Sequence, residues 1–308
     1  MFVFVFVFVF VFVLAGFTKY NSPPPPPPTL LLRLPGGLHV AAMTKHPFSY
    51  QHINPADVGN VRRTVLSELS GKGVILEKFR EAGLISWDGR PSDATNRRIN
   101  AILQRVKILE SEGACFEEGE GSVKLMLLHS TAGYCPPFRV LEYSVSVSDI
   151  DLDSATRVMK NDSVKTETCR ATIKLQQVDM EKFRREGVVD EVESLEVSEG
   201  VGPVDALKSC LEKALSKGWW RERRQEIVVT DYAVVILDGA EGTEVKTRVS
   251  IEFTNVGTKE KWKTTSVDRN IISASLNALV DGYEYALIEH ETLCFLCTDE
   301  DEDEDENE

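Results

Sequence analysis

The chain lacks the features that mark several large classes of protein. Its longest apolar run, Phe2–Leu14, has 13 residues, whereas a helix needs about 20 residues to span a bilayer. No basic residues precede this run, although a secretory signal would carry them there. No basic stripe stands out elsewhere, and an acidic chain repels phosphate backbones. We therefore expect no membrane span, no secretion and no nucleic-acid partner.

Histidine and cysteine are scarce and scattered. The five histidines are His39, His46, His52, His129 and His290. None of them forms the His-X-His pair of a common type of metal site. Cys294 and Cys297 make a single Cys-X-X-Cys, without the second pair that zinc would need or the helix N-terminus that would activate a redox thiol. We expect no metal site and no cofactor in this chain, and reduced thiols typical of the cytoplasm or a plastid stroma.

What remains is the composition of a globular protein. The chain has 308 residues, of which 42% are hydrophobic and 27% charged, which leaves room for two ordinary domains. The net charge of -14 comes largely from one end. Asp299–Glu306 and Glu308 supply nine of the 49 acidic residues, so the rest of the chain carries 35 basic against 40 acidic residues. We expect residues 292–308 to be a disordered acidic tail.

The first 35 residues are of low complexity. Phe-Val pairs fill the start of the chain, and six prolines, Pro23–Pro28, follow a short polar stretch. A strict dipeptide repeat is typical of a translated simple repeat and not of a folded element. We predict that residues 1–35 are a disordered leader or a gene-model artefact.

The next region is helical in pattern. Apolar residues recur near a period of 3.6 between residues 58 and 79, interrupted by a polar SGKG stretch, which predicts two helices. A third helix is predicted over about residues 93–112, with Asp93 or Thr95 as its cap and Gly113 at its end. After it, the apolar run SVKLMLLH precedes a Gly-Tyr-Cys-Pro-Pro turn.

From Phe138 onward the pattern changes to strands and repeats itself. Three segments that alternate apolar and polar residues precede a helix, and the same order then returns after roughly 75 residues. Each helix would cover one face of a three-stranded antiparallel sheet, because neither layer can bury its apolar side alone. The predicted strands are 138–149, 165–176, 193–200, 226–237, 243–255 and 261–270, and the predicted helices are 203–218 and 271–290. The expected fold class is α+β, a duplicated βββα unit with pseudo-twofold symmetry and a cleft between the two units.

The repeat carries motifs of a known enzyme family. EGVGPVDALKSCLEKAL, VTDYAVVILDG and SVDRNIISASLNALVDGYEYAL resemble the C-terminal regulatory domain of 2-isopropylmalate synthase and citramalate synthase. Upstream, GGLHVAAMTKHPFSYQHINPADVGN and SELSGKG resemble the linker subdomains that follow the catalytic barrel in these enzymes. These two segments resemble citramalate synthase more than 2-isopropylmalate synthase. The resemblance implies helical linker subdomains over residues 36–134 and a regulatory, dimerising domain over residues 135–291.

The resemblance also implies an activity and site residues. The family condenses acetyl-CoA with a 2-oxo acid, pyruvate in citramalate synthase, on a divalent metal held in a TIM barrel. The histidine of the GLH motif and the tyrosine before the I-x-P-x-x-V-G motif, here His39 and Tyr50, reach into the barrel of the partner in a homodimer. The regulatory domain binds isoleucine or leucine in an apolar pocket near the dimer interface. The matching positions are Val204, Val229, Tyr232 and Ile236.

The barrel itself is missing from this sequence. No His-X-His pair exists, and no strand–helix alternation of the required length precedes Gly36. The metal and acetyl-CoA are therefore expected only for the missing barrel, and the chain alone is expected not to catalyse the condensation. Three interpretations stay open: the C-terminal part of a citramalate synthase-like acyltransferase of isoleucine biosynthesis, that of a 2-isopropylmalate synthase of leucine biosynthesis, or a stand-alone amino-acid-sensing module. By pattern alone, His39 is a loop residue, Tyr50 a loop anchor and the three aliphatic positions ordinary core.

Overall fold

A computed structural model describes most of the chain between residues 53 and 289. The described residues are 32–34, 42, 46, 53–59, 62–84, 92–117, 119–131, 133–148, 168–179, 182, 185–186, 190–217, 227–237 and 245–289. Among them, no helix is both long enough and apolar enough to cross a membrane.

The first described elements are short. β1 (Leu32–Leu34) pairs in parallel with β2 (Arg62–Thr64), so a strand forms at the end of the low-complexity segment. A 3-10 helix, Pro55–Val58, lies before β2. The helix predicted from residue 58 to residue 69 is wrong. Gly59 adopts a φ of 71°, a left-handed conformation that stops a helix. Leu66 is buried, but Val58 and Leu69 are 54% and 71% exposed, so the predicted stripe does not form one buried face.

Three helices follow and share one core. They are α2 (Lys72–Glu81), α3 (Asp93–Ser111) and α4 (Glu120–His129). Their spacing of apolar residues produces the buried stripes that helical periodicity requires. The buried side chains that pack together here are Leu66, Val74, Ile75, Phe79, Ile99, Ile102, Val106, Phe116, Val123 and Leu127.

The start of α3 differs by one residue from the prediction. Ser92 is the N-cap, and its hydroxyl accepts a hydrogen bond from the Thr95 backbone N–H at 3.1 Å. Asp93 is instead the first helical residue, where its negative charge favours the positive end of the helix dipole. Gly113 follows the end of α3 with a φ of 103°, as the sequence predicts.

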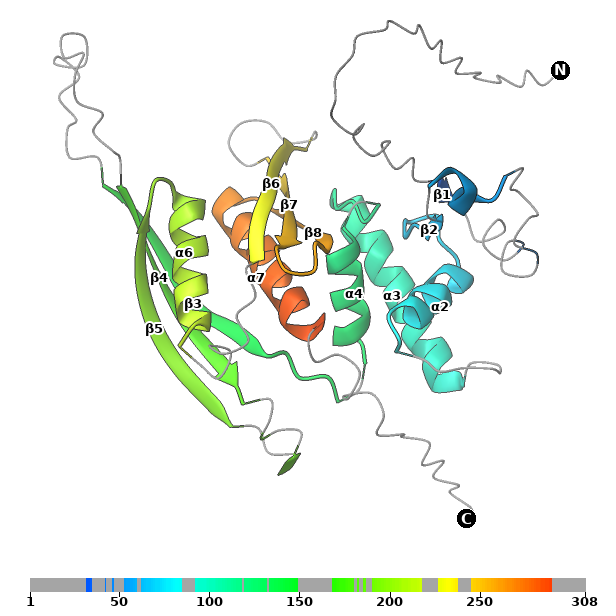
Figure 1. Ribbon diagram of the computed structural model, residues 1–308, viewed down its shortest axis with the longest axis horizontal. Helices are drawn as coiled ribbons and strands as arrows, with labels where there is room; N and C mark the ends of the chain where they lie inside the picture. Colours follow the sequence, from blue (N-terminus) through cyan, green and yellow to red (C-terminus); the bar gives the residue numbers. More distant parts are fainter. Residues whose placement is uncertain are drawn as a thin grey trace, which may run out of the picture.

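The second half consists of two βββα units, as predicted. The first contains β3 (Phe138–Ser148), β4 (Thr168–Val178), β5 (Glu191–Gly200) and α6 (Pro203–Leu215), and the second contains β6 (Ile227–Ile236), β7 (Thr247–Asn255), β8 (Lys261–Asp268) and α7 (Ile271–Glu289). Both sheets are antiparallel, with orders β3-β4-β5 and β6-β7-β8. α6 packs on β4 and β5, α7 packs on β7 and β8, and the two helices contact each other (Figure 1).

The duplication extends to single residues. The pairing of β3 with β4 shifts between Val140 and Glu142, and that of β6 with β7 shifts at the equivalent place, between Val229 and Asp231. In each unit a tyrosine follows the irregularity by one residue. Each irregularity re-aims the side chains that follow it, so Tyr143 on β3 and Tyr232 on β6 are placed in the same way in their units.

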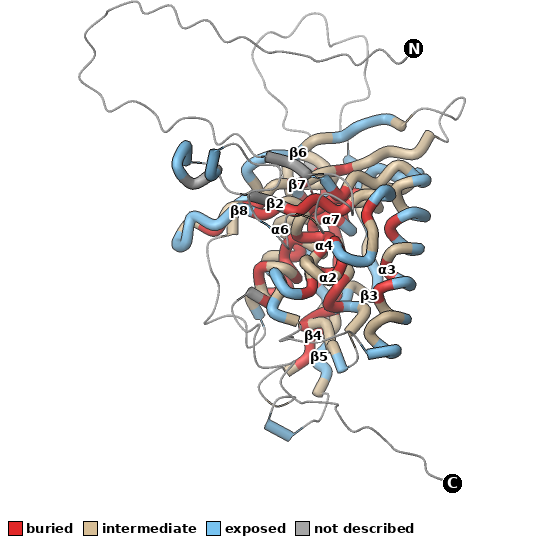
Figure 2. Tube along the Cα trace, turned by 90° about the vertical axis from the view of Figure 1, so that its right-hand side faces the viewer, coloured by how far each residue is buried: buried red, intermediate tan, exposed pale blue. Residues whose placement is uncertain are grey.

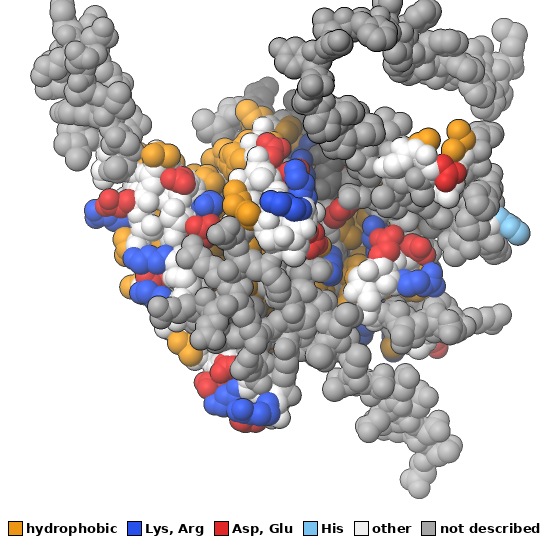
Figure 3. Space-filling view, in the orientation of Figure 1, with side chains coloured by type: hydrophobic (Ala, Val, Ile, Leu, Met, Phe, Trp, Pro, Cys, Tyr) orange, Lys and Arg blue, Asp and Glu red, His pale blue; other side chains and the backbone are white. Residues whose placement is uncertain are grey.

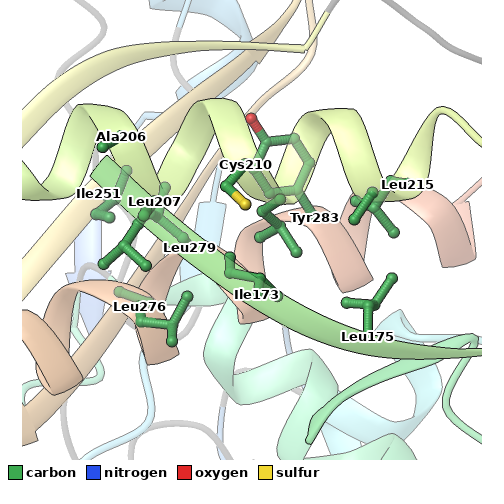
Figure 4. Close-up of a cluster of buried hydrophobic side chains, with 14 of the residues drawn as sticks. Ile173, Leu175, Ala206, Leu207, Cys210, Leu215, Ile251, Leu276, Leu279 and Tyr283 are labelled. Carbon is green, nitrogen blue, oxygen red and sulfur yellow. The ribbon is translucent and has the colours of Figure 1, made fainter. Parts of the chain in front are cut away.

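The two units share a single hydrophobic core. Figure 2 shows the buried residues concentrated where helices meet sheets, and in Figure 4 Ile173, Cys210 and Tyr283 lie together between α6, α7 and β4. Side chains fill the space where α6 meets α7, so the cleft predicted between the units is absent at this contact. The fully buried apolar residues are Ala171, Ile173, Leu175, Ala206, Leu207, Cys210, Leu211, Ala214, Val249, Ile251, Phe253, Ala274 and Ala278.

Candidate functional site

β6 presents an open apolar face at the edge of its sheet. Val229 and Tyr232 lie opposite the fully buried β7 residues that pack toward α7, and opposed side chains share a face of the sheet. Ile236, an even number of residues beyond Tyr232, lies on that face too. Its side chain is 70% exposed, so the face is covered near Val229 and open toward the end of the strand.

Three of the four predicted effector residues therefore share one strand face. The fourth, Val204, lies in the first turn of α6 and is half-buried against the core that both units form. Val229 packs against the same core.

β3 carries an equivalent strip that sequence reasoning missed. Tyr143, Val145 and Val147 occupy the positions that Tyr232, Val234 and Ile236 occupy on β6. Val147, like Ile236, is well exposed, at 62%. The signal was present in the sequence, since VLEYSV and VTDYAV are copies of one motif; we call these two sets the β3 strip and the β6 strip.

Both strips are tied to the N-terminal part of α7 by a tyrosine. The Tyr143 hydroxyl lies 2.8 Å from the Ser273 hydroxyl, and the Tyr232 hydroxyl lies 2.8 Å from that of Ser275. Ser275 donates its own proton to the Ile271 carbonyl, so Tyr232 is the donor to Ser275. The N-terminus of α7 and the two open apolar strips beside it offer both polar and apolar contacts to a small ligand.

The other face of β6 is also apolar. Val228 and Val235 are exposed there, and Figure 3 shows hydrophobic side chains gathered over β6 near the top of the molecule. β6 is an edge strand, and an exposed edge with apolar residues on both faces is a template for pairing with another chain.

A second group of polar residues lies where α4 meets α7, far from the predicted site. The Glu284 carboxylate accepts hydrogen bonds from His129 Nε2 and from the Tyr134 hydroxyl, both at 2.6 Å. Ser122 donates to the Asp281 carboxylate at 3.2 Å. We call Ser122, His129, Tyr134, Asp281 and Glu284 the α4–α7 polar cluster.

Burial and charge shift the titration of this cluster. Desolvation and the neighbouring Glu284 raise the pKa of Asp281 to about 7. The hydrogen bond to Glu284 raises the pKa of His129, and desolvation raises the pKa of Tyr134. No local sequence pattern reveals this cluster, because its α4 and α7 partners are roughly 150 residues apart.

Several sequence-based candidates are not placed. His39, Tyr50, Cys294 and Cys297 lie outside the described residues. The described part of the chain contains no group of three or more His, Cys, Asp or Glu residues that could hold a metal ion. Burial raises the pKa of the Cys135 and Cys210 thiols, which is the opposite of thiol activation.

Comparison with known proteins identifies the second half of the chain. Residues 142–287 match the LeuA allosteric (dimerisation) domain. These residues begin in β3 and end in α7, and they include both strips.

Longer matches come from curated enzymes. The chain is 35% identical over 252 residues to the (R)-citramalate synthase of Synechocystis sp., covering 82% of this chain and 41% of that protein. It is 32% identical over 256 residues to the (R)-citramalate synthase of Aquifex aeolicus, covering 83% and 42%. Identity to the 2-isopropylmalate synthase of Methanocaldococcus jannaschii is 23% over 255 residues, covering 83% and 41%.

The chain thus spans about two fifths of the length of the curated relatives it matches. The duplicated βββα fold, the matched domain and these identities agree with one another. The chain belongs to the citramalate synthase and 2-isopropylmalate synthase family and corresponds to its C-terminal part.

Proposed function

We propose that this chain is the C-terminal part of a citramalate synthase-type acyltransferase that joins acetyl-CoA to pyruvate in isoleucine biosynthesis. The higher identity to citramalate synthases than to the 2-isopropylmalate synthase supports this choice. The divalent metal and acetyl-CoA are proposed to bind a catalytic barrel of the complete enzyme. His39 and Tyr50 would act on the barrel of the partner subunit.

The regulatory half is proposed to bind a branched-chain amino acid, isoleucine in preference to leucine. The observation that carries this proposal is the β6 strip beside the start of α7. A branched aliphatic side chain would pack against Val229 and Ile236, while the carboxylate would lie near the positive end of the α7 dipole. Val204 would close the site from α6.

The same strand is proposed to form the homodimer. Among the described strands, β6 forms an edge of its sheet and carries apolar side chains on both faces, and it lies within the segment that matches a dimerisation domain. A ligand held on one face of an edge strand that pairs through the same edge would couple amino-acid binding to subunit contact. The four described cysteines without disulfides, Cys115, Cys135, Cys169 and Cys210, suit a reducing cytoplasm or stroma.

Thermal unfolding of the full chain with added amino acids tests the effector site. A ligand that binds only the folded state adds about 2.7 kcal/mol of stability at 100 times its dissociation constant, so millimolar isoleucine should raise the melting temperature more than leucine does. Ile236→Ala should weaken that response at least fivefold in ligand concentration, with little effect on the apo protein, because the side chain is mostly exposed.

Leu195→Ala is the matched control, because Leu195 is equally apolar and 65% exposed on β5. It should respond to isoleucine as the unaltered chain does. A larger rise in melting temperature with leucine than with isoleucine would instead favour a 2-isopropylmalate synthase of leucine biosynthesis. No shift with either amino acid would refute the site.

A further inference from the structure

The α4–α7 polar cluster joins the two halves of the molecule. α4 packs on the core of α2 and α3 through Val123 and Leu127, and its other side contacts α7 and β8. Ser122 bridges this second contact: its hydroxyl accepts from the Thr265 backbone N–H at 3.0 Å and donates to the Asp281 carboxylate at 3.2 Å. The position of the helical region on the regulatory domain therefore depends on the polar groups of α4 and α7.

The cluster contains two carboxylates and one cationic partner. Asp281 and Glu284 lie three residues apart on α7, which makes them neighbours on the helix surface. Glu284 is only 4% exposed, and Asp281 beside it is half-buried. His129, the last residue of α4, is bonded to Glu284, and a positive charge at a helix C-terminus is favourable.

We propose that the α4–α7 polar cluster is a proton-dependent latch, which holds α4 on α7 while His129 is protonated and Asp281 is neutral and weakens when both have lost their protons. In the protonated state His129⁺ balances Glu284⁻ and the neutral Asp281 needs no partner. In the deprotonated state two carboxylates share one enclosed site without a cation, which is strongly unfavourable.

The other charged groups nearby do not replace the missing cation. Lys124, also on α4, lies over the ring of Tyr285 at 5.2 Å, and its charge interacts with Glu260. Tyr134 donates to Glu284 and, with its pKa raised, stays neutral. Cys135 adds no positive charge. The contacts that Thr265 on β8 makes with Ser122 are uncharged.

The two titrations act in the same direction. The pKa of Asp281 is raised to about 7 from 3.8, so its support for docking is complete below about pH 3.8, falls as the pH rises and is lost above about 7. The pKa of His129 is also raised, so its contribution is complete below 6.5 and is lost as the pH rises through the folded value. The His129 side chain is 50% exposed, so water screens its ion pair with Glu284. Asp281 therefore contributes the larger part of the pH dependence of docking.

Amide hydrogen exchange of α4 in the full chain, without added amino acids, tests the latch at pH 6.0 and 8.5. From the pKa of about 7, Asp281 alone should make the protection of α4 fall about tenfold between these pH values, after correction for chemical exchange. The Asp281→Asn variant mimics the protonated form, so most of this pH dependence should disappear. His129→Gln, which keeps a donor for Glu284 without the charge, should remove the smaller remaining part.

Glu212→Gln is the matched control, because Glu212 is a carboxylate that contacts α7 from α6, through Tyr283. It should keep the full pH dependence of α4. Equal protection of α4 at both pH values in the unaltered chain would overturn the proposal, as would an Asp281→Asn variant that follows the unaltered chain. If Asp281→Asn does not fold, the pH dependence of α4 protection in the unaltered chain and in His129→Gln still tests the proposal. Because no effector is present, failure here leaves the proposed amino-acid site untouched.

Discussion

At the scale of single residues, the approach of α7 to its sheet depends on the absence of a side chain at Gly282. A Cβ atom at this position would lie 2.1 Å from the ring of Phe253. The fully buried Phe253 is also stacked against Trp262, with ring centroids 5.6 Å apart, so the ring has little freedom to move. The indole of Trp262 in turn donates to the Gly282 carbonyl at 3.0 Å.

Gly282→Ala should therefore destabilise the protein although alanine is the better helix former. Overpacking of a filled core costs about 1–3 kcal/mol, which outweighs the roughly 1 kcal/mol gained from helix propensity. Gly73→Ala in α2 is the control, since no atom lies within 4 Å of its added Cβ, and it should be neutral or stabilising. Urea unfolding measures both; a stable Gly282→Ala variant would show that α7 can shift away from β7.

The contacts of single residues were also the hardest feature to predict from the sequence. Val229, Tyr232 and Ile236 came from the family resemblance, and the β-strand period of two explains why they share a face. Tyr143 and His129 were not singled out, because their partners Ser273 and Glu284 are 130 and 155 residues away. Hydrogen bonds between such distant residues depend on the packing of whole elements, which periodicity does not specify.

At the scale of elements, the repeat was predictable because each strand alternates against a single core. α4 was harder to assign. Its apolar residues lie on several sides, since Val123 and Leu127 face the α2–α3 core while Leu125 and Leu128 face α7. A short helix buried on two sides has no clear 3.6 period and cannot be told from a buried strand by pattern alone.

The edge strand β6 makes a prediction about assembly. Val235→Lys places a charge on the exposed face of this strand, away from α7, where the fold of one chain has no need of an apolar residue. If β6 pairs with a second copy, the lysine replaces an apolar contact with the neighbouring strand of the partner, so it should raise the dimer dissociation constant about tenfold, a cost of about 1.4 kcal/mol.

Leu195→Lys, on the exposed edge strand β5, provides the comparison and should leave the dimer intact. Analytical ultracentrifugation over a range of concentrations separates the two variants. If Leu195→Lys weakens the dimer and Val235→Lys does not, the interface lies on the β3-β4-β5 sheet and not on β6.

At the scale of the whole molecule, the described residues form two large cores linked by α4. One core is helical and the other is shared by the two βββα units. Fold class could be read from the sequence because both cores follow simple periodicities. The arrangement of the two cores could not, because it depends on contacts such as Ser122 with Thr265.

The central claim is that the β6 strip and the start of α7 form an amino-acid site in this regulatory domain. Hydrogen exchange across the full chain, with and without saturating isoleucine, tests it most directly. We predict increased protection in β6 and in the first turn of α7. Protection confined to other elements, or binding without any change at β6 and the start of α7, would contradict the account.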